Sequence, residues 1–274
     1  MPMSNESVLT REELANRFRE VGLEQGDSVV THSSFRSLKP IEGGPEVVIL
    51  ALLDVVGPKG NLVFPTFTNY GYDSPDWYFD PAETPCRTGI IPETARKWPG
   101  AVRSLHPTHS VTVIGPDAEA LTRDHLKYRA VGIGSPLDRL AEMGGKVLLI
   151  GVNNTTNTTV HVGEEHTDVP RVSATPLPKV KIRLPDGKMI EHQLDTSPSC
   201  STAFEAIDYP LRRKNQLNDG GAGRSKLTLM KGADIITVVG EMIKDKPDIL
   251  LCTNKRCTRC QKTREVLRAM GRIP

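Results

Sequence analysis

The sequence predicts an α/β fold, a mixed sheet with flanking helices and an antiparallel hairpin insert. Three observations support this prediction. Short β-branched runs alternate with helical patterns, and the order strand, loop, helix, strand near the N-terminus is that of a βαβ unit. Two alternating runs joined by "PDG" predict the hairpin at about residues 178–196. Neither a repeat nor a low-complexity linker divides residues 1–274, so we expect a single domain.

The first four elements have clear local signals. Residues 10–21, "TREELANRFREV", begin with a capping threonine, have a glutamate three positions later and predict a helix. The β-branched run "SVVTHSSF" predicts a strand that ends at His32 to Ser34. The run "GGPEVVILALLDVVG" predicts a helix that stops at Gly57, and "GNLVFPTFT" predicts the next strand.

The later elements follow the same logic. Residues 69–85 are rich in Tyr, Asp and Pro and predict a long surface loop, and residues 94–98 predict a short helix. A strand is expected in "SVTVIG" and a helix in "PDAEALTRDH". The run "SPLDRLAEMGGKVLLIGV" predicts a helix, a glycine break and a buried strand. From Asn218 onward the pattern predicts a strand and an amphipathic helix.

Composition and charge exclude several classes of protein. The hydrophobic content of 38% and charged content of 25% are ordinary for a globular protein. No apolar run approaches the roughly 20 residues of a membrane helix, and no export signal is seen, so we expect a cytoplasmic protein without a membrane partner. A net charge of +2 does not favour nucleic-acid binding, and the basic C-terminal stretch is interpreted as a solvated tail.

The most unusual stretch is "GVNNTTNTTVHVGEEH", which follows the apolar run "KVLLI". If a helix starts near Thr158 or Thr159, with one of these as its cap, His161 and Glu164 share one helix face. Imidazole titrates near pH 6.5 and can accept a proton at neutral pH, while a neighbouring carboxylate can fix its tautomer. The alternative is a capped helix with solvated His and Glu side chains.

Five stretches, in order and at similar spacing, resemble the aminoglycoside 3-N-acetyltransferase family of the antibiotic N-acetyltransferase type. They are "THSSFRSL" with the following helix and strand, "FDPAETP", "VRSLHPTHSVTVIGP", "GSPLDRLAEMGGKVLLIGV" and "NTTVHVGEE". The similarity runs from about residue 8 to the C-terminus and is nearest the branch that acetylates apramycin-type and gentamicin-type antibiotics. It implies that family's fold and an acetyl-coenzyme A-dependent enzyme that acetylates the 3-amino group of aminoglycosides and confers resistance.

The resemblance also implies roles for individual residues. His161 would be the general base and Glu164 its orienting carboxylate, with His32 and Thr158 as helpers at the thioester. Without a cysteine or serine in the context of an acyl-enzyme nucleophile, direct transfer in a ternary complex is expected. The coenzyme A site would comprise two segments: Ser33, Ser34, Phe35, Arg36 and Ser37, then Arg103, His106 and Ser110. For at least one of the last three, core packing or loop bracing is the better interpretation.

The polycationic acceptor should meet an acidic pocket with aromatic faces for sugar rings. The candidate substrate contacts are Tyr72, Asp73, Asp80, Asn157, Glu165 and Asp168. A generic acidic loop is the alternative. The family often carries an acid three positions before its threonine, where this chain has Thr155. Either another carboxylate holds the substrate amines or the acceptor preference differs.

Four cysteines suggest a structural metal site. Cys252, Cys257 and Cys260 lie in the Cys-rich C-terminal segment 250–274, and Cys200 follows the hairpin. Four thiolates suit tetrahedral zinc, which would pin the C-terminal helix to the hairpin. A reduced set without metal is the alternative, and a redox pair lacks a thioredoxin-like context. Cys86 lies apart and is interpreted as a loop residue.

Two rival functions remain open at this point. The same chemistry could act on a different amine, such as a biosynthetic intermediate or an amino sugar. Alternatively, the chain could be a non-catalytic relative that binds coenzyme A, an interpretation favoured by the missing acid at Thr155. We expect a monomer or a homodimer.

Overall fold

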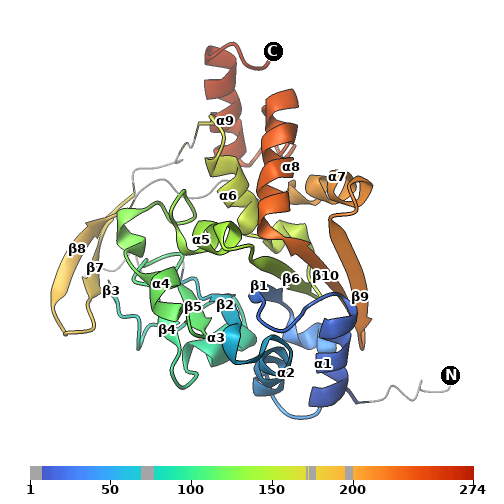
Figure 1. Cartoon of the computed structure of the whole chain (residues 1–274). Helices are drawn as coiled ribbons and strands as arrows, with labels where there is room; N and C mark the ends of the chain where they lie inside the picture. The colour runs from blue at the N-terminus through green and yellow to red at the C-terminus, as the bar shows by residue number, and fades with distance from the viewer. Residues whose placement is uncertain (1–7, 69–76, 171, 173–176, 195–199) are drawn as a thin grey trace.

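A seven-stranded mixed sheet forms the centre of the computed structural model, which describes residues 8–68, 77–170, 172, 177–194 and 200–274 (Figure 1). The strand order is β4-β5-β2-β1-β6-β10-β9. The central strands β2, β1 and β6 run parallel, and the outer neighbours pair antiparallel. The strands are β1 (Ser28–Ser33), β2 (Asn61–Pro65), β4 (Val102–Arg103), β5 (Val111–Ile114), β6 (Lys146–Ile150), β9 (Leu217–Ala222) and β10 (Ser225–Lys231). The predicted fold class is confirmed.

Helices cover both faces of this sheet, because its buried strands alternate their side chains between two apolar cores. Val29 contributes to the core under the first group of helices and Val30 to the core on the opposite face. The first group is α1 (Arg11–Glu20), α2 (Glu46–Val56) and α3 (Ile90–Arg96). The second is α4 (Ala118–Thr122), α5 (Pro136–Glu142), α6 (Thr159–Glu165), α7 (Asp208–Arg213) and α8 (Gly232–Asp245).

Helix α1 begins with the capping box that its sequence predicts. The Thr10 side chain accepts a hydrogen bond from Glu13 N–H, and the Glu13 carboxylate accepts one from Thr10 N–H, which completes the expected capping box. Other boundaries differ from the prediction. Helix α3 begins at Ile90 and ends at Arg96, rather than spanning residues 94–98. The two-residue strand β4 and the strand β9 were not predicted.

A second, three-stranded sheet has the order β3-β7-β8. Its strands are β3 (Tyr78–Phe79), β7 (Lys179–Arg183) and β8 (Met189–Gln193), so the alternating runs around "PDG" form the expected antiparallel hairpin. Strand β3 pairs with β7 in parallel, and the Phe79 side chain is fully buried. The expectation that residues 69–85 form a surface loop is therefore wrong at β3, because an apolar ring anchors that strand beneath the hairpin.

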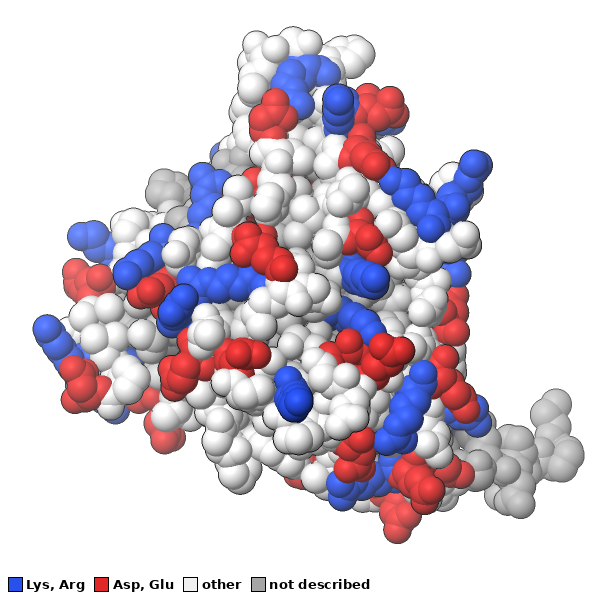
Figure 2. All heavy atoms as spheres, viewed as in Figure 1, with Lys and Arg blue, Asp and Glu red and all other residues white. Residues whose placement is uncertain are grey.

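The C-terminal helix α9 (Thr258–Ala269) lies at the end of the molecule opposite α1 and α2 (Figure 1). Among the described residues, no helix combines the length and the apolar character required to cross a bilayer. Lys and Arg side chains are interspersed with Asp and Glu over the visible face (Figure 2), which agrees with the small net charge. The expected location and oligomeric state stay predictions.

Candidate active site

Two neighbouring parallel strands bring the candidate site together. His32 lies near the carboxyl end of β1 and is paired in register with Leu149 of β6. The polar segment that follows β6 passes through a short 3-10 turn, η4 (Asn154–Thr156), into α6. Because parallel strands end at the same edge of a sheet, His32 meets this segment although they are far apart in sequence.

The start of α6 is capped by a residue other than those expected. Thr158 occupies the capping position with helical backbone angles, and its side chain makes no capping hydrogen bond. Instead Asn157 Oδ1 accepts from Thr159 N–H at 3.1 Å, while Asn157 Nδ2 donates to Asn154 Oδ1 at 3.0 Å. The expected capping by Thr158 or Thr159 is therefore wrong. Asn157, predicted to contact substrate, is buried with both ends of its amide bonded within the protein.

His161 and Glu164 form the pair that the sequence spacing predicted. The His161 Nδ1 atom lies 2.7 Å from Glu164 Oε2, and the two side chains are only 9% and 2% exposed. Because an ionised carboxylate can only accept, the proton of the neutral ring lies on Nδ1 and the lone pair on Nε2. The ring of Phe204, in the turn η5 (Phe204–Ile207), packs edge-to-face on this imidazole at a centroid distance of 4.6 Å. The arrangement can accept a proton at a defined atom.

His32 and Thr158 also come together. Thr158 N–H donates to His32 Nε2 at 3.3 Å, so the neutral His32 ring carries its proton on Nδ1. Burial lowers the pKa of His32 to about 4, because it disfavours the charged ring. At neutral pH His32 is therefore an uncharged hydrogen-bond donor and not a base.

The predicted cofactor segment after β1 folds into the 3-10 turn η1 (Phe35–Leu38). Ser37 Oγ donates to Ser34 O at 2.6 Å and lies 2.6 Å from Ser225 Oγ, which ties the turn to β10. Ser33 Oγ is buried and has no hydrogen-bond partner within the described chain. Phe35 packs against the first core, and Arg36 is exposed. Among the described residues, the segment thus offers one buried hydroxyl without a partner, that of Ser33, and one exposed cation, that of Arg36.

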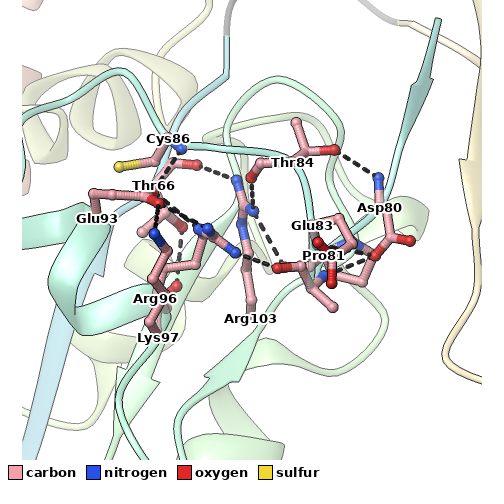
Figure 3. Close-up of polar contacts among 12 residues, drawn as sticks. Thr66, Asp80, Pro81, Glu83, Thr84, Cys86, Glu93, Arg96, Lys97 and Arg103 are labelled. Atoms are coloured by element: carbon pink, nitrogen blue, oxygen red, sulfur yellow. Dashed lines mark hydrogen bonds and ion pairs between the residues drawn. The ribbon is translucent and has the colours of Figure 1, made fainter.

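Arg103, expected to bind a phosphate, is largely occupied in bracing a loop (Figure 3). Its guanidinium donates to the carbonyl oxygens of Thr66, Pro81 and Thr84 and to Ser110 Oγ. Burial lowers the pKa of Arg103 to about 10. The neighbouring Arg96 bonds Glu93 at 2.7 Å in the same network. These contacts match the alternative of loop bracing, and contact with coenzyme A stays a prediction.

Sequence reasoning named His106 as a coenzyme A contact but missed two histidines, His109 and His125, whose rings lie near it. His106 is centred 4.8 Å from His125 and 6.1 Å from His109, and its Nε2 is buried without a partner in the described residues. Burial lowers the pKa of His109 to about 3. The signal was the second histidine of "LHPTHS". For Phe204 no local signal existed.

The described acidic residues that were predicted to contact substrate each lie next to an arginine of the protein. The Asp80 carboxylate accepts from Ala82 N–H at 2.8 Å and lies 3.4 Å from Arg183. Glu165 pairs with Arg129 at 3.1 Å. Asp168 pairs with Arg272 at 2.9 Å, with 78% of its side chain exposed. Tyr72 and Asp73 lie outside the described residues.

The structure brings the four predicted cysteines into one cluster. The Sγ atoms of Cys200, Cys252, Cys257 and Cys260 all lie within 4.8 Å of one another. Tetrahedral zinc with bonds of about 2.3 Å would need sulfur separations of roughly 3.8 Å, so the set fits such an ion after small side-chain movements. Cys86 lies apart in the network of Figure 3, where burial raises its pKa.

Comparison with known proteins assigns this arrangement to a family. A family model described as aminoglycoside 3-N-acetyltransferase matches residues 30–244. Aminoglycoside N(3)-acetyltransferase IV of Salmonella sp is 34% identical over 85% of this chain and 87% of its own length. These matches confirm the resemblance drawn from the sequence motifs.

Solved structures agree. A mutant of the aminoglycoside acetyltransferase AAC(3)-IVa in complex with a gentamicin superposes with a TM-score of 0.85 and 30% identity. That match covers 96% of this chain and 99% of the other. AAC-IIIb in a binary complex with CoASH gives a TM-score of 0.75 and 28% identity, over 88% and 98% of the two chains.

Proposed function

This chain belongs to the aminoglycoside 3-N-acetyltransferase family, and from that premise we propose that His161 is the general base of a direct acetyl transfer. An aminoglycoside amine is the acceptor and acetyl-coenzyme A the donor. The observation that carries the proposal is the buried 2.7 Å bond between His161 Nδ1 and Glu164 Oε2, which directs the ring's lone pair to Nε2. Coenzyme A and gentamicin are bound by relatives of this fold.

An alkyl amine is mostly protonated at neutral pH and cannot attack a thioester until it loses a proton. In the proposed step the neutral amine nitrogen attacks the acetyl carbonyl carbon while Nε2 of His161 takes an N–H proton. Collapse of the tetrahedral species breaks the carbon–sulfur bond and releases coenzyme A as its thiol or thiolate. Glu164 stabilises the imidazolium that forms, because its carboxylate already accepts the Nδ1 proton.

His32 and Thr158 would act on the thioester rather than on the amine. The neutral His32 ring can donate from Nδ1, since its Nε2 already accepts from Thr158 N–H. A donor of this kind can stabilise the oxyanion of the tetrahedral species, where removal of one donor typically costs ~10²–10³-fold in rate. The Thr158 hydroxyl, at the first turn of α6, is the second candidate.

Acceptor recognition is proposed to rely on the acids near the end of α6. Asp168 is the most exposed of the described candidates, and Glu165 comes directly after the catalytic pair. Thr155 is uncharged, and both its backbone N–H and its hydroxyl donate to Asn153 Oδ1. Acetylation assays on apramycin, gentamicin and neomycin against simple amino sugars would separate an aminoglycoside enzyme from one for another amine.

His161→Ala tests the base directly. We expect kcat to fall by ~10²–10⁴-fold while the fold is retained. Initial-rate lines that intersect on varying both substrates would support a ternary complex, whereas parallel lines and an acetylated enzyme would contradict direct transfer. A variant with wild-type kcat would eliminate His161 as the base.

We further propose that the four-cysteine cluster holds a structural zinc ion, which would join the segment at Cys200 to the start of α9. The support is the geometry of four sulfur atoms within 4.8 Å of one another. Mass spectrometry of untagged protein should find about one zinc per chain. Less than about half an equivalent, with all four thiols reacting in the native protein, would rule the ion out.

A further inference from the structure

We propose that Phe204 is a positioning residue for the reaction, holding the His161 imidazole in the plane in which Nε2 can reach the substrate amine. The inference rests on His161 being the base. Phe204 lies 43 positions beyond His161 and reaches it only through the tertiary fold. Its side chain is fully buried, and the two ring planes meet at 69° with a centroid distance of 4.6 Å.

Hydrogen bonding and ring packing restrain the His161 imidazole in different ways. The bond from Nδ1 to Glu164 restrains the position of one ring atom. The aromatic ring of Phe204, packed edge-to-face against the imidazole, opposes tilting of the imidazole plane, because the contact is lost when the plane tilts. Small misplacements of a reacting atom can cost ~10²-fold in rate, so this restraint matters to the chemical step.

The structure also provides a support for Phe204 itself. Its backbone N–H donates to Ser201 O at 3.0 Å, which closes the turn that begins beside Cys200. Cys200 and Ala203 pack against the apolar cluster made by Leu251, Cys252, Cys260 and Leu267. On its other side the ring joins the second core, together with residues of α6 and α8. The C-terminal cysteine-rich segment therefore braces the wall against which the catalytic imidazole rests.

Two substitutions test the inference while keeping the site apolar: Phe204→Leu and Phe204→Met. The matched control is Ile207→Ala, which removes a fully buried side chain of the same turn and core. For each variant we would measure kcat, KM for both substrates and the melting temperature. We would also record the His161 Nδ1–H resonance in ¹⁵N-histidine-labelled protein, assigned by its absence in His161→Ala.

We expect both Phe204 variants to lower kcat by ~10–100-fold with KM changed by less than ~3-fold, and to broaden the Nδ1–H resonance. Ile207→Ala should destabilise the protein at least as much, keep kcat within ~3-fold of wild type and leave that resonance sharp. Wild-type kcat in both Phe204 variants, or an equal loss of kcat in Ile207→Ala, would overturn the inference.

Failure of this inference is distinguishable from failure of the proposed function. If His161→Ala is nearly inactive while the Phe204 variants keep full kcat and a sharp resonance, only the role of Phe204 is refuted. If His161→Ala keeps wild-type kcat, the proposed base and this inference fail together.

Discussion

Glu164→Gln is the substitution that most directly tests the proposed catalytic pair. Glutamine has nearly the same shape as glutamate, so the buried position next to His161 stays filled and no cavity opens. The change removes the negative charge that accepts the Nδ1 proton at 2.7 Å. It also allows the amide nitrogen to donate to Nδ1, which would move the ring proton to Nε2 and block proton acceptance there.

The expected magnitude follows from the loss of a charged hydrogen bond in a buried site. Such bonds contribute about 1.5–3 kcal/mol, and about 1.36 kcal/mol corresponds to a tenfold change in rate. If only this stabilisation of the imidazolium is lost, kcat should fall by ~10–150-fold. If the tautomer is inverted as well, the loss should approach ~10⁴-fold, as for a triad that loses its orienting carboxylate.

The assay is steady-state acetylation followed by mass spectrometry of the product, with circular dichroism to establish that the variant folds. Glu165→Gln is the matched control, since it removes the adjacent acid, which forms an ion pair with Arg129. We expect the control to change KM for the aminoglycoside more than kcat. A Glu164→Gln enzyme with kcat within ~3-fold of wild type would refute the reasoning.

Three further predictions concern stability. Burial lowers the pKa values of His32, His109 and His125 to about 4, 3 and 3, respectively. Below pH 6.5 the unfolded chain therefore binds more protons than the folded chain, and the free energy of unfolding measured in urea should fall by up to ~1.4 kcal/mol per histidine for each pH unit. A free energy of unfolding that stays constant from pH 7 to pH 5 would contradict this. Arg103→Ala should lower the free energy of unfolding by ~2–4 kcal/mol, at about 1 kcal/mol for each lost hydrogen bond. A melting temperature within ~2 °C of wild type would show that these hydrogen bonds do not stabilise the loop. Gly163→Ala would place a methyl group 2.8 Å from a side-chain carbon of Val239 in α8. We expect it to lower the free energy of unfolding by ~1–3 kcal/mol and to reduce kcat, because α6 is displaced. An unchanged melting temperature in calorimetry together with an unchanged kcat would show that the helices can separate at little cost.

Local sequence signals predicted the elements whose stabilising contacts are themselves local. The capping box of α1 and the turn of the β7–β8 hairpin are each encoded within a few residues. Strands β4 and β9 were missed because β4 has two residues and β9 reads "LNDGGA". Such sequences have little strand propensity of their own, and pairing with β5 and β10 holds them.

The same distinction explains which site residues could be predicted. His161 and Glu164 are three positions apart, so helical geometry alone places them on one face. The contact of Phe204 with His161 depends on chain folding over 43 residues, for which the sequence has no periodicity. Arg103 shows the opposite difficulty: its charge suits a phosphate, but three backbone carbonyl groups and one hydroxyl surround the guanidinium.

The arrangement of the proposed site depends on sheet register as much as on the residues that form it. His32 and Thr158 are joined by a hydrogen bond across 126 positions, because β1 and β6 are parallel neighbours and end at one edge. A shift of β1 by one residue would turn His32 to the opposite face of the sheet and bring its neighbour to the site. The two cores oppose this shift, since it would move Val29 and Val30 out of the positions against which each core is packed. The packing that stabilises the fold therefore also fixes which imidazole lies beside Thr158.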